Sequence, residues 1–170
     1  LAAFVAGACR PAPPGEAPTA SPTAPATPGT VATWLSATLD AVCPSDGTTQ
    51  RETHEEGHLH TLVCAQPEGH SVTVTVETFG DFGAARVAFD EARGNNAVEV
   101  FHGAPSVSWH EDHPSLPGGR AEIHVWLWQA GEHLVRVESY DETAQEVMPA
   151  QETIVEVLHS LGLEQGLLQR

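Results

Sequence analysis

Histidine and glutamate are concentrated at His54-Glu55-Glu56-Gly57-His58, which has the spacing H-E-x-x-H. On a helix, this spacing places two imidazoles on one face, where they can bind zinc. The Glu55 carboxylate is then free to act as a general base on a metal-bound water. A further His or carboxylate would have to complete the ligand set. The pattern therefore raises metal-dependent hydrolysis as a hypothesis.

The surrounding sequence argues against a helix at this point. Gly57 weakens a helix, and Arg51-Glu52-Thr53 before the motif supplies no apolar face. An alternating pattern typical of a strand follows at once, over residues 58–65. We therefore expect a turn leading into a strand, with His54 and His58 not on one helical face.

Weaker metal binding stays open at two places. His58 and His60 would lie on one face of the expected strand, and His54 could approach from the preceding turn. A second cluster of imidazoles and carboxylates occupies residues 110–113. No cofactor is expected from the sequence; if a metal is bound at either place, imidazole with carboxylate suits zinc or copper. The alternative is that these histidines are ordinary surface residues.

A second candidate site lies on a hairpin expected over residues 121–140. Its alternating pattern favours a three-residue loop at residues 130–132, which would place Trp126 opposite Arg136. One face would then combine aromatic and charged side chains, as recognition surfaces do. If another element covers the tryptophans, they belong to the core instead. The residues of this expected face are Glu122, His124, Trp126, Trp128, Arg136, Glu138 and Tyr140.

The chain has three cysteines, Cys9, Cys43 and Cys64. If Cys9 belongs to a cleavage and lipid-attachment motif, Cys43 and Cys64 remain as one pair, and a disulfide between them suits an oxidising compartment. Such a bridge would join the end of the first expected helix to the end of the first long strand. The alternative is two separately buried thiols.

Small residues precede the remaining cysteine in Val5-Ala6-Gly7-Ala8-Cys9. This segment resembles the lipobox of bacterial lipoproteins, in which signal peptidase II cuts before a cysteine that then carries lipid. The resemblance implies that residues 1–8 are the remnant of a signal peptide and that Cys9 is the lipid (palmitate) attachment site. It places the protein at the cell envelope, membrane-anchored on the extracytoplasmic side. Ordinary secretory cleavage after Ala8, without lipid, is the alternative.

Residues 9–30 carry this cysteine and a segment rich in Pro, Ala and Thr that cannot bury a core, so we expect a disordered stalk. Residues 31–170 are long enough for one globular domain. The net charge of −16 opposes contact with nucleic acid phosphates and anionic lipid headgroups. Membrane contact is therefore expected only through the N-terminal lipid.

The pattern of residues 31–170 predicts an α+β domain, with a mostly antiparallel sheet of about six strands packed against about three helices. Thr30 and Asp81 are expected to cap the first two helices, and Pro149 to open the third. The apolar residues expected to face inward on the second helix are Phe82, Ala85, Phe89 and Ala92. We expect helices over residues 30–42, 81–93 and 149–162, and strands over 58–65, 71–79, 97–102, 106–111 and the hairpin.

No phosphate-binding glycine loop or nucleophile motif is present in the sequence. We therefore expect a binding or envelope-interaction module without evident catalysis, whose partner is an unknown envelope ligand or protein. A metal-binding protein, or a metal-dependent hydrolase that uses the His54–His58 segment, is the alternative.

Overall fold

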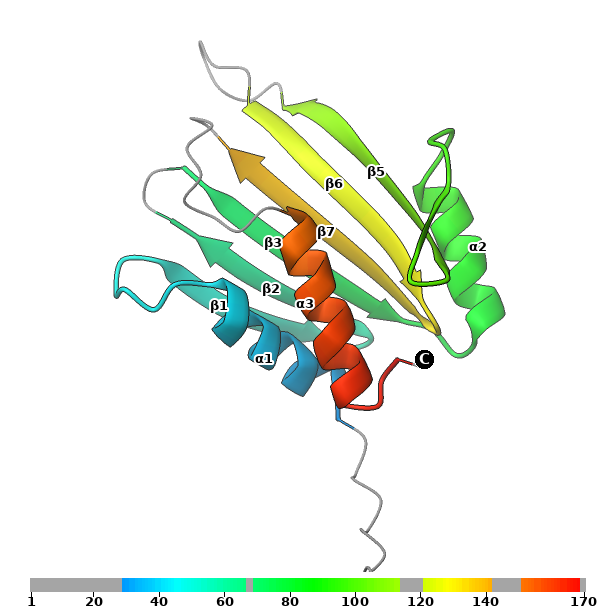
Figure 1. Ribbon diagram of the computed structural model, residues 1–170, viewed down its shortest axis with the longest axis horizontal. Coiled ribbons are helices and arrows are strands. Elements are labelled where there is room, and N and C mark those ends of the chain that lie inside the picture. Colours follow the sequence, from blue (N-terminus) through cyan, green and yellow to red (C-terminus); the bar gives the residue numbers. More distant parts are fainter. Residues whose placement is uncertain (1–28, 67–68, 114–120, 142–150, 169–170) are drawn as a thin grey trace, which may run out of the picture.

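The computed structural model describes residues 29–66, 69–113, 121–141 and 151–168 (Figure 1). Cys9, the stalk up to residue 28 and Pro149 lie outside these residues. Among the described residues, no helix combines the length and apolar character needed to cross a bilayer.

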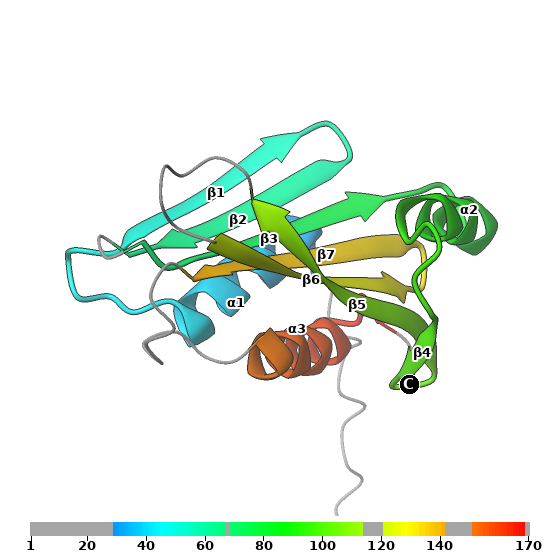
Figure 2. The ribbon, with the colours of Figure 1, turned by 90° about the horizontal axis from the view of Figure 1, so that it is seen from above.

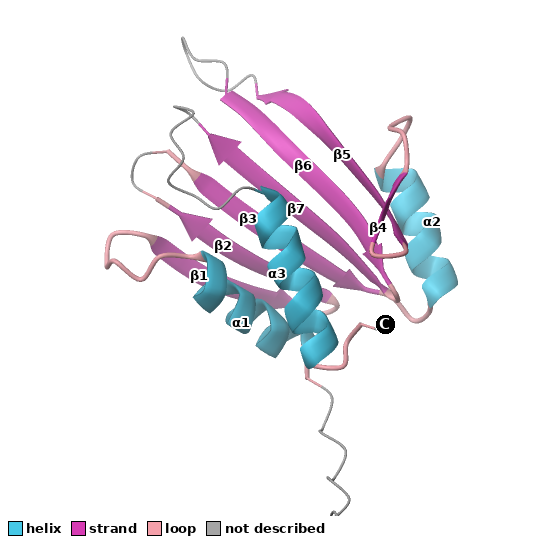
Figure 3. Ribbon diagram, viewed as in Figure 1, coloured by secondary structure: helices cyan, strands magenta, loops and turns pink. Residues whose placement is uncertain are grey.

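The described residues form one α+β domain around a seven-stranded antiparallel sheet (Figure 3). The order of strands across the sheet is β1-β2-β3-β7-β6-β5-β4. The predicted class and the three helices are confirmed, with one strand more than the expected number. The strands are β1 (Gln50–Glu56), β2 (Leu59–Ala65), β3 (Ser71–Thr78), β4 (Glu99–Phe101), β5 (Ala104–His113), β6 (Ala121–Ala130) and β7 (His133–Asp141).

The three helices cover the sheet unequally. Helices α1 (Val31–Val42) and α3 (Gln151–Glu164) pack side by side on one face, which we call the helix-pair face (Figure 2). There, Trp34 is fully buried and its indole N–H donates to the Leu158 carbonyl oxygen at 2.8 Å. Helix α2 (Phe82–Ala92) covers one end of the opposite face, the α2 face, through Phe89 against Leu127 and Leu134.

Local signals positioned the first two helices correctly. The hydroxyl of Thr30 accepts a hydrogen bond from the Thr33 N–H, and the Asp81 carboxylate accepts one from the Ala84 N–H. Each bond satisfies a helical N–H that has no partner within its own helix. The expected starts of α1 and α2 are therefore confirmed.

The Cys43–Cys64 disulfide is confirmed, with Cα atoms 5.8 Å apart. It joins the residue that ends α1 to strand β2 in the core. The bridge therefore holds one helix of the helix-pair face to the sheet beneath it.

The sequence pattern did not predict strand β1, which contains His54. This edge strand exposes nearly all of its side chains, so its sequence does not alternate between apolar and polar residues. It pairs with β2 across a turn at Gly57, where φ is 64°. The expectation that His54 and His58 do not share a helical face is confirmed.

The predicted register of the β6–β7 hairpin is wrong. Ala130 pairs with His133 around a two-residue turn, Gly131-Glu132, rather than around a three-residue loop. Consequently Trp126 lies opposite Val137, not opposite Arg136. The prediction assumed one buried face, whereas helices pack on both faces here, so apolar side chains occur on both sides of β6.

Candidate functional site

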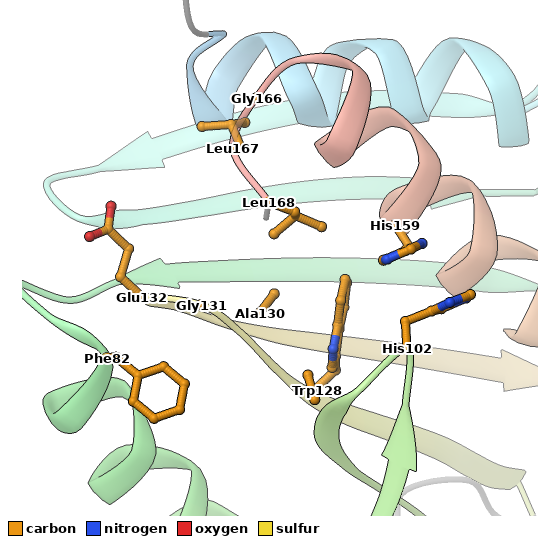
Figure 4. Close-up of a pocket in the computed structure, with 11 residues that line it drawn as sticks. Phe82, His102, Trp128, Ala130, Gly131, Glu132, His159, Gly166, Leu167 and Leu168 are labelled. Carbon is orange, nitrogen blue, oxygen red and sulfur yellow. The ribbon is translucent and has the colours of Figure 1, made fainter. Parts of the chain in front are cut away.

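A pocket of about 540 Å³ opens at the end of the sheet where β6 turns into β7 (Figure 4). It lies between the β4–β5 turn, the start of α2 and the chain that follows α3. Its lining combines apolar side chains with two imidazoles and one carboxylate. The lining residues are Phe82, His102, Ala104, Trp128, Ala130, Gly131, Glu132, His159, Gly166, Leu167 and Leu168.

The chain after α3 closes one side of this pocket. Gly166 has a φ of 70°, a conformation that favours glycine and ends the helix. The Leu168 N–H then donates back to the Gly162 carbonyl oxygen at 3.2 Å. A Cβ at Gly162 would lie only 2.6 Å from Leu168 Cδ1, so glycine permits this close return. The wall formed by Leu168 therefore depends on two glycines.

Phe82 forms an apolar rim at the other side of the pocket. The helical pattern placed this ring in the core, but 59% of the residue is exposed. Phe82 belongs to the first turn of α2, whereas the buried residues of this helix, Ala85 and Phe89, come later. The expected inward positions of Phe82 and Ala92 are therefore wrong, and the Phe82 ring is available to the pocket.

Two imidazoles are stacked at the polar edge of the pocket. The rings of His102 and His159 are nearly parallel, at 5°, with centroids 3.8 Å apart. His102 Nε2 also lies 2.9 Å from a carboxylate oxygen of Glu156. Among the described residues, these three form a group that could hold a metal ion, with ligand atoms all within 4.8 Å of one another.

The β4–β5 turn and helix α3 position the members of this cluster. His102 and Gly103 form the β4–β5 turn with φ values of 48° and 80°, as a tight two-residue hairpin requires. Glu156 and His159 are three residues apart on α3 and so share a helix face. Phe101 packs its ring edge-on against both imidazoles, at 4.4 Å and 5.8 Å between centroids.

Burial lowers the pKa of His159, and the adjacent His102 lowers that pKa further, while Glu156 acts in the opposite direction. The neutral form of this imidazole is therefore favoured near pH 7. A neutral ring carries a nitrogen lone pair, which is the form that binds metal.

The metal ligands expected from the sequence are not brought together. His54 pairs with Glu52 at 2.9 Å, and His58 pairs with Glu77 at 3.1 Å. His54 lies opposite Thr61 in the ladder, so it faces away from His60. In the cluster at residues 110–113, His110 packs against His124, whereas Glu111 accepts from the Trp109 indole on the other face.

The recognition face expected on the hairpin is divided between the two sides of the sheet. Trp128 is buried on the helix-pair face with Trp126 half-buried beside it. Arg136 and Glu138 form an ion pair at 2.6 Å on the other face, where Arg136 also lies 5.6 Å from the Trp109 ring. The observed register therefore puts the tryptophans and Arg136 on opposite faces of the sheet, and the expected single surface does not form.

The other three residues of that expected face also do not form a common site. His124 lies beside His110, with ring centroids 4.1 Å apart. Tyr140 is at the far end of β7 from the pocket, and the side chain of Glu122 is outside the described part.

The sequence analysis missed the cluster at His102, Glu156 and His159. The spacing of Glu156 and His159 was a usable signal, because residues three apart meet on a helix surface. Nothing local connects them with His102, which is 54 residues before Glu156.

No protein-family model and no curated protein matches this sequence. Among solved structures, a crystal structure from Bacteroides thetaiotaomicron is similar, with a TM-score of 0.43 and 10% identity. The similarity covers 66% of this chain and 40% of that chain. A likeness of this extent says nothing about function.

Proposed function

We propose that this domain is a binding module that holds a small molecule in the pocket beside Trp128, without evident catalysis. The observation that carries the proposal is the pocket itself. Its volume of about 540 Å³ falls within the range of small-molecule sites. Its lining is mixed, because two imidazoles and a carboxylate lie beside the aromatic and aliphatic side chains.

The lining indicates the kind of ligand. The exposed Phe82 ring provides most of the aromatic surface, because Trp128 and Leu168 are nearly buried, and this surface favours an apolar part in the ligand. The Glu132 carboxylate and the net charge of −16 disfavour anions. We therefore propose a neutral or cationic ligand with an aromatic or aliphatic body.

The proposed location follows from the N-terminal sequence and the cysteines. A lipid on Cys9 would hold the domain at the outer side of the cytoplasmic or outer membrane, on the stalk of residues 10–30. The disulfide between Cys43 and Cys64 supports an oxidising compartment. The third cysteine is then left for the lipid. The natural partner is an envelope ligand or protein, and nucleic acid is disfavoured by charge.

Titration of the domain with a set of small aromatic and aliphatic amines, followed by NMR chemical shifts, tests the pocket. Phe82→Ser removes a ring at the rim that is exposed in the free domain and would be buried by a bound ligand. Because burying an aromatic side chain contributes on the order of 1.5 kcal/mol or more, the substitution should weaken binding by about tenfold. Val87→Ser is the matched control, since Val87 is equally exposed, at 59%, on the same helix but does not line the pocket.

Binding that shifts the signals of Trp128 and His159 and depends on Phe82 supports the proposal. It is overturned if none of the amines shifts these signals, or if Phe82→Ser and Val87→Ser bind equally well.

A further inference from the structure

We propose that His102, Glu156 and His159 form a binding site for a divalent transition metal, zinc or copper. This site goes beyond the proposed small-molecule function and does not depend on it, because its ligands are this chain's own side chains.

The distances are close to those that metal binding requires. Zinc binds imidazole nitrogen and carboxylate oxygen at about 2.0–2.2 Å, so two ligand atoms on a tetrahedral ion lie about 3.3 Å apart. His102 Nε2 and Glu156 Oε2 are already 2.9 Å apart. All three ligand atoms lie within 4.8 Å of one another. The ligand atoms must therefore move by at most about 1.5 Å. The parallel rings of His102 and His159 must also tilt, because the lone pairs that bind the ion lie in the ring planes.

The three side chains differ in how freely they can make this adjustment. Glu156 has the most room, since its side chain is 55% exposed. The His102 side chain is 40% exposed, but its ring is stacked on His159 and packs against Phe101 at 4.4 Å between centroids, so it turns only by leaving this stack. His159 is more constrained, since Phe101 and Trp128 both contact its ring, at 5.8 Å between centroids in each case. Binding of an ion would therefore draw in the Glu156 carboxylate and replace the stacking of His102 on His159.

The chemical nature of the ligands selects the type of metal. Two imidazoles and one carboxylate suit zinc or copper, whereas calcium and magnesium prefer oxygen ligands alone. Three protein ligands leave a fourth tetrahedral position open. Since His102 and His159 also line the pocket, that open position would lie at its edge.

A second imidazole distinguishes this cluster from the other His–carboxylate pairs. His54 with Glu52 and His58 with Glu77 are similar surface pairs at 2.9 Å and 3.1 Å. Neither pair belongs to a group of three such ligands among the described residues. These two pairs are therefore matched controls, because each has the same His–carboxylate contact but lacks a third ligand.

Calorimetric titration of the whole domain with zinc at pH 7, and absorption spectroscopy with Co²⁺ as a zinc substitute, test the site. The wild type should bind one ion, and Co²⁺ should give the intense visible bands of a tetrahedral complex. His159→Gln and His102→Asn should each weaken binding at least about tenfold. Asn is chosen because it tolerates the positive φ of His102. Glu156→Gln should weaken binding while keeping the size of the side chain.

The double variants His54→Gln/His58→Gln and His110→Gln/His124→Gln should bind zinc as the wild type does. The amide NMR spectrum of each variant establishes that it is folded. The proposal is overturned if the wild type takes up no zinc in this titration. It is equally overturned if folded His159→Gln retains full affinity, or if either double variant abolishes binding. The amine titration tests the small-molecule pocket separately, so a result that overturns the metal site does not overturn the proposed function.

Discussion

Trp126 and Arg136 lie on neighbouring strands but project from opposite faces of the sheet. Trp126 is opposite Val137 and Arg136 is opposite Leu127. A register shifted by one residue would place Trp126 opposite Arg136 and bring the two side chains into contact. Trp126 instead packs edge-on against Phe101, with centroids 5.5 Å apart.

This separation predicts that the two side chains contribute independently to stability. Trp126→Ala should lower the free energy of unfolding by about 2 kcal/mol, because a half-buried aromatic is removed. Arg136→Ala should lower it by less than about 1 kcal/mol, since its ion pair is partly exposed. In the double variant, urea unfolding should give the sum to within about 0.5 kcal/mol. A coupling energy well above that value would contradict the observed register.

The Cys43–Cys64 disulfide should stabilise the domain substantially. Replacing both cysteines by serine should lower the free energy of unfolding by about 3 kcal/mol, since the bridge closes a loop with a sequence separation of 21. Urea unfolding curves of the wild type and the double variant measure the difference. Adding a reductant should shift the wild-type curve toward that of the variant and leave the variant unchanged. Equal unfolding midpoints without reductant would show that the bridge adds no stability.

His133 should make the domain less stable in mild acid. Burial lowers the pKa of this imidazole below its ordinary 6.5, with a further lowering from His60 and an opposing effect from Glu132. The unfolded chain therefore takes up a proton at a higher pH than the folded domain does. Stability from this residue is complete above pH 6.5 and is lost as the pH falls through that value toward the lower folded pKa.

Urea unfolding of His133→Gln between pH 7.5 and pH 5 tests this prediction. The loss of stability across this range should be smaller in the variant than in the wild type. His58→Gln, which removes an exposed imidazole, is the control and should follow the wild-type pH dependence. If the free energy of unfolding of His133→Gln falls with pH as steeply as that of the wild type, the acid sensitivity belongs to other groups.

Anchoring of the protein should depend on Cys9. Cys9→Ala should either block processing or move the protein from the detergent phase to the aqueous phase in a detergent phase-separation experiment. Intact mass of the membrane-derived wild type should show the added lipid. If the variant is processed and partitions like the wild type, anchoring does not use this cysteine.

Much of the fold could be predicted from local sequence, because the relevant interactions are local. A cap such as Thr30 or Asp81 acts on an N–H three residues away, so a short segment contains the whole signal. The alternating valines of β3 likewise reveal one buried face directly. The pairing of Cys43 with Cys64 was a natural expectation once Cys9 was assigned to the lipobox-like motif.

The sequence could not reveal β1 or the hairpin register. An edge strand with nearly every side chain exposed has no burial pattern to read. On β6, packing by α2 on one face and by α1 and α3 on the other buries side chains on both sides. Alternation then no longer selects one register, and the turn at Gly131 decides it.

Only the tertiary structure assembled the candidate site. His102 reaches Glu156 and His159 because β4 and β5 place their turn beside α3, and the pocket exists because the chain after Gly166 folds back over the sheet. The sequence by itself determined the three helices and every strand except β1, because each of these segments carries its own cap or burial pattern. It left the meeting of distant imidazoles undetermined, because that meeting depends on how separate elements pack and not on the residues next to them.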